Sequence, residues 1–125
     1  MIVKQMVGIT LDCNDLDKMV EFYHKLLGWE VLSEFASEEY GALRSTYGWI
    51  LTFQKVEGFV PPVWPWEKGK QQQMAHFDFC VDNLSEAVEK AISLGATKAE
   101  VQYYDTTVVM KDPEGRPFCL MTEVF

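Results

Sequence analysis

The chain has few basic residues, few cysteines and no long apolar runs, and each shortage excludes a class of protein. Eleven lysines and arginines stand against nineteen acidic residues, which gives a net charge of -8. Binding to nucleic acid or to an anionic membrane surface depends on Lys and Arg, so neither partner is expected. No apolar run approaches the length of a membrane span. The charge is compatible with a cationic ligand, although a simpler interpretation is that it keeps the protein in solution.

The cysteines and the first residues predict where the protein works. The three cysteines are odd in number and show no spacing typical of a metal or redox motif. Residues 1–5 lack the apolar stretch of a secretory signal. We therefore expect a cytoplasmic protein with reduced thiols.

The most informative feature of the sequence is an internal repeat. Residues 8–11 align with residues 76–79 at an offset of 68, and apolar helix positions follow at the same offset. Further along, an offset of 67 carries Gly28 onto Gly95, Gly48 onto Gly115 and Thr52 onto Cys119. A repeat of this size predicts two copies of one structural unit.

Hydrophobic periodicity predicts the same order, β-α-β-β-β, in both copies. The first copy has predicted strands at 2–12, 29–35, 39–46 and 49–56, with a helix from Asn14 or Asp15 to Gly28; the second has strands at 74–81, 97–103, 106–111 and 117–124, with a helix from Asn83 to Gly95. We expect one domain over 1–125, made of module one (1–56), a linker (57–73) and module two (74–125). Three prolines exclude an ordinary helix or central strand from the linker.

Several short motifs carry a resemblance to a known family. Phe22-Tyr23, Leu26-Leu27-Gly28 and Asp112-Pro113-Glu114-Gly115 stand in this order along the chain. Together they resemble the glyoxalase/bleomycin-resistance/dioxygenase superfamily, also called vicinal oxygen chelate, and in particular its glyoxalase-like branch. The resemblance implies an α+β fold in which two tandem βαβββ modules form an open, barrel-like cleft. It also implies homodimers, and a divalent metal held by the first and fourth strands of each module.

This chain departs from the family at the metal-ligand positions. Gly8 and Thr52 stand at the two positions of module one, and neither is a strong ligand. In module two His76 matches the pattern, while Cys119 stands where the family has Glu. We therefore predict no metal and no other cofactor. One alternative stays open, namely that His76 and Cys119 hold a soft ion such as zinc.

Strand alternation identifies the candidate site residues. His76 and Asp78 are two residues apart, so both should face the cleft while Phe77 and Phe79 face the core. We predict His76 as a catalytic base that Asp78 orients; the alternative is a pair that only stabilises the sheet. Cys119 would be a nucleophile only if its pKa were lowered, and otherwise it is a packing residue. The residues predicted to contact a ligand are Thr52, Gln54, Cys119, Trp49, Trp66 and Asp12.

Two functions remain open at this point. The first is metal-independent binding of a small molecule, cationic or aromatic, as the bleomycin-resistance members of the superfamily suggest. The second is a lyase- or isomerase-type enzyme that uses His76 as a base. The sequence names neither ligand nor substrate.

Overall fold

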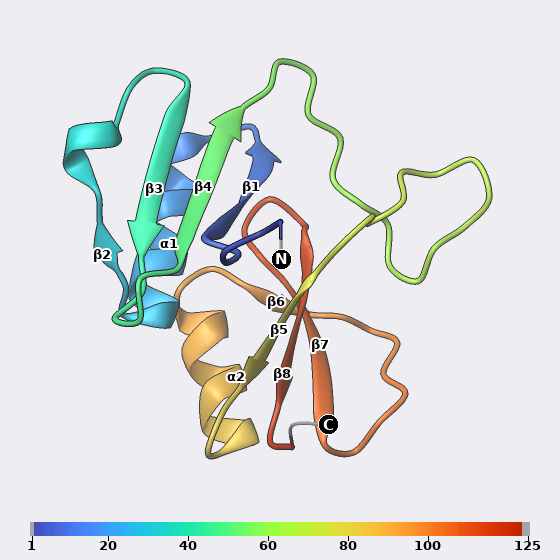
Figure 1. Cartoon of the computed structure of the whole chain (residues 1–125). Coiled ribbons are helices and arrows are strands. Elements are labelled where there is room, and N and C mark those ends of the chain that lie inside the picture. Colours follow the sequence, from blue (N-terminus) through green and yellow to red (C-terminus); the bar gives the residue numbers. More distant parts are fainter. Residues whose placement is uncertain (1, 124–125) are drawn as a thin grey trace. The chain divides into compact units, whose positions relative to one another are not determined.

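The computed structural model describes residues 2–123, and these residues form two compact units, one running through Phe59 and the other starting at Val60 (Figure 1). The first contains β1 (Gly8–Cys13), α1 (Leu16–Leu27), β2 (Glu30–Val31), the short 3-10 helix η1 (Ser33–Phe35), β3 (Tyr40–Arg44) and β4 (Ile50–Lys55). The second contains β5 (Phe77–Cys80), α2 (Leu84–Ser93), β6 (Thr97–Lys98), β7 (Thr107–Lys111) and β8 (Pro117–Met121).

The two sheets have the same topology, which confirms the predicted pair of βαβββ modules. The strand orders are β1-β4-β3-β2 and β5-β8-β7-β6, and in both sheets the first strand runs parallel to the fourth. The pairing registers also agree. Thr10 lies opposite Thr52 in the first sheet, and Asp78 lies opposite Cys119 in the second. These pairs are related by the offsets of 68 and 67 seen in the sequence.

Each helix begins at the cap that the sequence predicts and packs on its own sheet, although α2 ends at Ser93 with Leu94, and not Gly95, as its C-cap. The Asp15 side chain accepts a hydrogen bond from the backbone N–H of Lys18, and Gly28 ends α1 with a φ of 71°. Asn83 caps α2 in the same way. The buried face of α1 includes Tyr23, whose ring stacks on Phe53 of β4 at a centroid distance of 5.3 Å. This packing fixes the helix-covered face of the sheet, so the polar side chains of β1 and β4 turn to the other face.

The turn between the third and fourth strands recurs with a buried side-chain acceptor. In the first unit the Ser45 hydroxyl accepts a hydrogen bond from the backbone N–H of Trp49 at 2.8 Å. In the second unit Asp112 accepts from the corresponding N–H, that of Arg116, at 3.1 Å and also from that of Glu114 at 2.9 Å. Both acceptors are 3% exposed. The sequence repeat showed the turn glycines, but not that these side chains close the turns.

Most of the predicted linker belongs to the second unit. The Trp64 indole N–H donates to the carbonyl of Val101 at 3.4 Å, and its ring meets the edge of Tyr103. Val63 donates its backbone N–H to Gln71, which closes this loop on itself. The segment from Val60 onward therefore packs as a covering loop and not as a free connection.

Some predicted strands are shorter in the structure. The first begins at Gly8 and not at residue 2, and the fifth begins at Phe77, so that His76 directly precedes β5. The predicted strand at 29–35 is wrong beyond Val31, where η1 follows, and that at 97–103 ends at Lys98. Residue 124, within the last predicted strand, lies outside the described residues.

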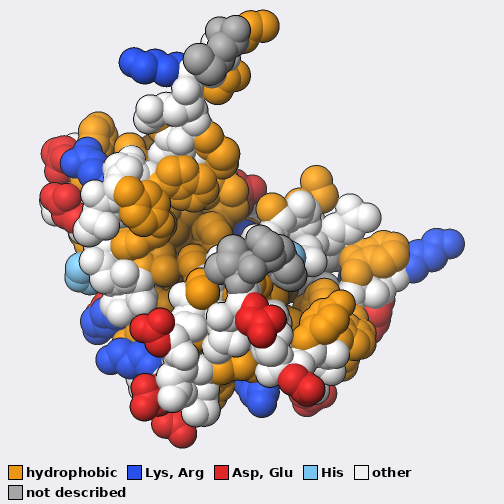
Figure 2. Space-filling model, turned by 60° about the horizontal axis from the view of Figure 1, so that its bottom comes forward, with side chains coloured by type: hydrophobic (Ala, Val, Ile, Leu, Met, Phe, Trp, Pro, Cys, Tyr) orange, Lys and Arg blue, Asp and Glu red, His pale blue; other side chains and the backbone are white. Residues whose placement is uncertain are grey.

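The surface of the described residues is mixed in character. Hydrophobic side chains reach the face shown in Figure 2 beside scattered acidic and basic groups. The exposed large apolar side chains include Ile2, Tyr47, Val60, Trp66, Tyr103 and Tyr104. Among residues 2–123, no helix is long and apolar enough to cross a membrane.

Candidate functional site

The candidate site lies on the face of the second sheet that α2 leaves open. Phe77 and Phe79 stack on each other at 5.3 Å, and Phe79 contacts Phe118, so these rings occupy one face of the sheet. Because successive side chains of a strand alternate, Asp78 and Cys119 occupy the opposite face. Their strands pair in parallel with these two residues directly opposed.

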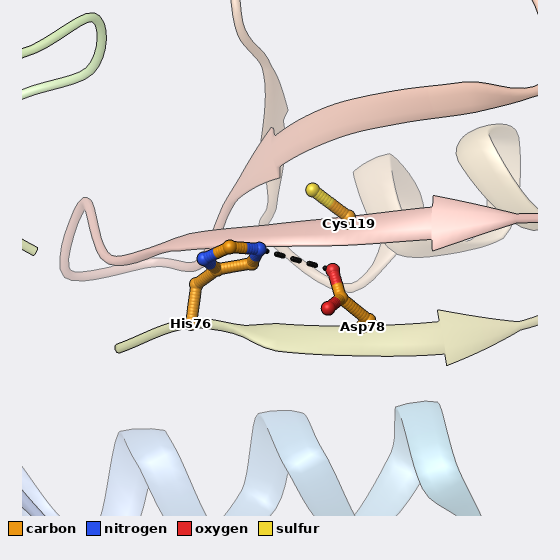
Figure 3. Close-up of side chains that lie close together, drawn as sticks. All are labelled: His76, Asp78 and Cys119. Atoms are coloured by element: carbon orange, nitrogen blue, oxygen red, sulfur yellow. Dashed lines mark ion pairs between the residues drawn. The ribbon is translucent and has the colours of Figure 1, made fainter. Parts of the chain in front are cut away.

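His76 contacts Asp78 along the same edge. Its ring atom Nε2 lies 3.0 Å from Oδ1 of Asp78, and the two side chains are 34% and 47% exposed. Figure 3 shows both side chains between β5 and β8, with the Cys119 sulfur close by. Strand alternation predicted that the two residues share a face, and the structure adds that they are in contact.

The thiol of Cys119 is held in its protonated form. Its pKa is raised from 9.0 to about 11, first by burial, then by the charge of Asp78 and by the hydrogen bond that the thiol donates to this carboxylate. A nucleophilic cysteine needs a lowered pKa. Burial and Asp78 keep this thiol protonated, which favours the alternative that Cys119 is a packing residue and not a nucleophile.

The equivalent face of the first unit carries a different set of side chains. Thr10 and Thr52 take the places of Asp78 and Cys119. Next along these strands, the Gln54 side-chain amide donates to Oδ1 of Asp12 at 2.6 Å. The structure thus brings together two of the predicted ligand contacts, Asp12 and Gln54, within module one.

The two predicted tryptophans lie in connecting segments. Trp49 closes the turn between β3 and β4 through its backbone N–H. Trp66 lies in the loop before β5, is 52% exposed, and donates its indole N–H to the carbonyl of Lys70 at 3.2 Å. The role of these rings as ligand contacts stays a prediction.

Two cavities in the first unit were not anticipated from the sequence. One, of about 670 Å³, lies around the start of α1, and the other, of about 300 Å³, lies between α1 and the segment around β2 and β3. The first is lined partly by Asp15, Glu38 and Lys55, the second by Val20, Leu32 and Ala42. Neither contains a residue predicted for the site, and we place the site where ring, carboxylate and thiol converge because those groups carry the chemistry.

Comparison with known proteins identifies the family. The family model described as "Glyoxalase-like domain" matches residues 8–121. The chain belongs to this family. It is therefore a member of the glyoxalase/bleomycin-resistance/dioxygenase superfamily, as its motifs suggested. No curated protein matches the glyoxalase-like chain.

Solved structures with this fold come from several bacteria. A glyoxalase/bleomycin resistance protein/dioxygenase family enzyme from Burkholderia phytofirmans PsJN has a TM-score of 0.68 at 18% identity, covering 90% of this chain and 94% of that one. A glyoxalase-related enzyme from Fulvimarina pelagi gives 0.65 at 18% identity, with coverages of 95% and 88%. A mutant of the fosfomycin resistance protein FosX from Listeria monocytogenes, complexed with Mn(II) and 1S,2S-dihydroxypropylphosphonic acid, gives 0.75 at 14% identity, with coverages of 99% and 94%.

The metal site that the family implies does not fit this glyoxalase-like chain. Gly8, at the first ligand position, lies so close to the backbone of Ile50 that a Cβ there would collide with the Ile50 carbonyl oxygen. No side chain can therefore be placed at position 8 without moving β1. Thr52 offers only a hydroxyl, a poor ligand for transition metals. Module one thus provides no strong ligand at either position, and the chemistry derived below uses no ion shared between the modules.

A different set of donors exists in module two. One ligand atom from each of His76, Asp78 and Cys119 lies within 4.8 Å of the other two. The sequence predicted His76 and Cys119 as ligand types and Asp78 only as the group that orients the ring. The spacing His-x-Asp at the start of β5, with Cys in the strand paired to it, is the signal that could have revealed the third donor.

Proposed function

We propose that this glyoxalase-like protein binds a small molecule on the polar face of its second module, without the metal of a two-module site. The observation that supports this most directly is the pair of His76 and Asp78, in contact at 3.0 Å yet 34% and 47% exposed. A ring and a carboxylate that served only to stabilise the sheet would not need to remain open to solvent. Polar groups that converge on one exposed spot are typical of a ligand site.

The charges favour a ligand that is cationic or rich in hydrogen-bond donors. Asp78 accepts a hydrogen bond from the Cys119 thiol and contacts the His76 ring, and an exposed carboxylate oxygen can accept more than one further bond. The net charge of -8 adds a general attraction for cations. The remaining proposed contacts are Asp12, Thr52, Gln54, Trp49 and Trp66. An aromatic ring that stacks on a planar ligand contributes about 1 kcal/mol, so each tryptophan should tune affinity and not determine it.

A binding screen on tag-free, chelator-treated protein tests this proposal. The panel holds cationic aromatic antibiotics and small keto and hydroxy acids, together with fosfomycin and its phosphonic diol, which the structural neighbours suggest. We expect thermal stabilisation by at least one compound, and tryptophan-fluorescence titration then gives its affinity. His76→Ala and Asp78→Asn should each weaken binding about tenfold or more, as expected for a lost charge-assisted hydrogen bond.

Cys80→Ser is the matched control for this screen. Cys80 lies on the same strand and the same face, two residues beyond Asp78, but outside the cluster. Its substitution should leave the affinity unchanged. A ligand that bound equally well to the intact protein, His76→Ala and Asp78→Asn would place the binding site elsewhere and overturn the proposal.

A second candidate function is proton transfer with His76 as the base, in a lyase- or isomerase-type reaction. The geometry favours it in one respect. With Nε2 donating to Asp78, the ring carries its lone pair on Nδ1, which Figure 3 shows on the side of the ring away from the carboxylate. Turnover of a keto or hydroxy acid that fell by a factor of about 10² or more in His76→Ala would favour the enzyme. Binding of the same compound without turnover would favour the binding protein.

Two further expectations belong to this proposal. We place the protein in the reducing cytoplasm, because its three cysteines are odd in number and show no spacing typical of a metal or redox motif. We also propose a homodimer, because apolar side chains in the loop that begins at Val60 remain exposed.

A further inference from the structure

The three donors of module two form a compact set that needs nothing from module one. Asp78 of β5 and Cys119 of β8 are paired by the register of one sheet, and His76 directly precedes β5, so all three belong to the second unit. We propose that His76, Asp78 and Cys119 form a binding site for one soft divalent cation, Zn²⁺, within module two alone.

The distances suit such an ion after a small adjustment. Zinc binds nitrogen and oxygen at about 2.0 Å and sulfur at about 2.3 Å, which places tetrahedral ligands about 3.3–3.8 Å apart. The three ligand atoms now lie within 4.8 Å of one another, and one pair, Nε2 and Oδ1, is 3.0 Å apart. Because the His76 and Asp78 side chains are 34% and 47% exposed, rotation about their own bonds can supply the difference without moving the strands.

The chemistry of the donors selects the ion. A nitrogen, an oxygen and a sulfur donor together favour zinc over Mg²⁺, Ca²⁺ or Mn²⁺, which prefer all-oxygen sites. On binding, the thiol of Cys119 releases its proton to solvent and bonds through sulfur, and His76 binds through one ring nitrogen in its neutral form. A thiolate and a carboxylate then balance the two positive charges, and the fourth position is left for water or for a ligand.

This site differs from the arrangement that the family implies. In the family arrangement the ligands come from both modules. In this chain the backbone of Ile50 leaves no room for a ligand side chain at position 8 of module one. The new donor, Asp78, lies two residues beyond the first-strand position. The site therefore requires no particular placement of one unit against the other.

The inference goes beyond the proposed function and has a consequence for it. The ion would occupy the same ring and carboxylate that the metal-free protein offers to its ligand. Bound zinc should therefore weaken the binding of any ligand found in chelator-treated protein. The two ideas fail separately, because ligand binding is measured with chelator present and the ion is detected without a ligand.

Cobalt(II) provides a direct probe, since it replaces zinc and its spectrum reports sulfur ligation. Tag-free, chelator-stripped protein is titrated with Co²⁺ under reducing conditions. We expect d–d bands of tetrahedral intensity with a near-ultraviolet thiolate-to-cobalt band, saturating at one ion per chain and abolished by one equivalent of Zn²⁺. Asp78→Asn and His76→Ala should weaken Co²⁺ binding at least about tenfold, because even outer-shell changes typically cost 10- to 100-fold.

The cysteine variants distinguish this site from other thiols. Cys119→Ser should lose the thiolate band, and the exposed Cys80→Ser should retain it. Thermal unfolding of each stripped variant checks that it is folded, and a variant that fails this check is replaced by Cys119→Ala or His76→Gln. A thiolate band that is absent from the intact protein, that persists in folded Cys119→Ser, or that disappears in Cys80→Ser would overturn the proposal.

Discussion

Asp78 and Cys119 are direct partners in the parallel pairing of β5 and β8, and Asp78 accepts the hydrogen of the thiol. The same two positions in the first sheet hold Thr10 and Thr52, a pair with no titratable group. One copy of the repeat thus has a titratable pair at a position where the other has two hydroxyls.

The reactivity of Cys119 should depend strongly on pH and on Asp78. Because its pKa is raised to about 11, the folded protein holds the thiol proton more tightly than the unfolded chain, whose pKa is near 9.0. The stability that this proton contributes is present below pH 9 and is lost as the pH rises towards 11. At pH 8 only about one thiol in a thousand is ionised, so alkylation should be slow.

Iodoacetamide alkylation of the Cys80→Ser background, followed by mass spectrometry, measures this. The rate at Cys119 should rise up to about pH 11, and Asp78→Asn should shift the inflection to lower pH, because it removes the carboxylate's charge. An inflection below pH 9.0 in the protein with Asp78 intact would contradict the arrangement.

Adding a side chain at position 8 should destabilise the first unit. In Gly8→Ala the new methyl group meets the Ile50 carbonyl oxygen, so β1 must shift from β4. We expect a loss of about 1–3 kcal/mol in the free energy of unfolding, as for other overpacked sites. Urea denaturation measures this. Thr10→Ala, an exposed substitution on the same strand, should change stability by less than about 0.5 kcal/mol. Equal stability of Gly8→Ala and the unaltered protein would show that β1 and β4 leave room for a side chain at position 8.

The two equivalent turns give a comparison within one chain. Ser45→Ala removes one hydrogen bond to a backbone N–H, an expected loss of about 1 kcal/mol. Asp112→Ala removes two such bonds and the buried carboxylate that faces Arg116, so we expect about 3 kcal/mol or more. Urea unfolding of the two variants tests the order. A larger loss in Ser45→Ala would mean that the pairing of Asp112 with Arg116 does not stabilise the second unit.

A dimer should be detectable in solution. Val60, Tyr103 and Tyr104 are 60%, 62% and 73% exposed, and apolar surface of this kind is usually covered by a partner. Light scattering at micromolar protein should give twice the chain mass of 14.4 kDa. A species at 14.4 kDa alone, across a tenfold range of concentration about the micromolar level, would rule the dimer out.

The fold could be predicted because the repeat shows which segments of the two copies are equivalent. Matching apolar stripes and caps at offsets of 68 and 67 determine which strands are equivalent, and the sheets follow that equivalence. The edge strands were harder to predict. β6 ends at Lys98, yet the Gln102 side chain bonds both the N–H and the carbonyl of Val109 and takes the place of strand backbone at the edge of β7. A propensity pattern cannot show a side chain that replaces strand backbone in this way.

The sequence predicted which candidate side chains share a face, but not which of them are in contact. Alternation along β5 placed His76 and Asp78 on one face, and the repeat identified Cys119 as their counterpart on β8. The hydrogen bond from the Cys119 thiol to Asp78 depends on the register between strands and on rotamers, which a single sequence does not specify. For this reason the sequence left open whether Cys119 is a nucleophile or a packing residue, whereas the structure shows a thiol stabilised in its protonated form.

The tight contact between Gly8 and Ile50 limits how this protein can be re-engineered. A histidine introduced at position 8 would not recreate the absent ligand, because β1 would first have to separate from β4. Thr10 and Thr52 are better positions for introducing metal ligands, since they already lie opposite each other as Asp78 and Cys119 do. Grafting Asp and Cys at these two positions would copy two of the three donors into the first unit. The resulting chain would carry one complete and one partial cation site, and comparing their affinities would isolate the contribution of the histidine.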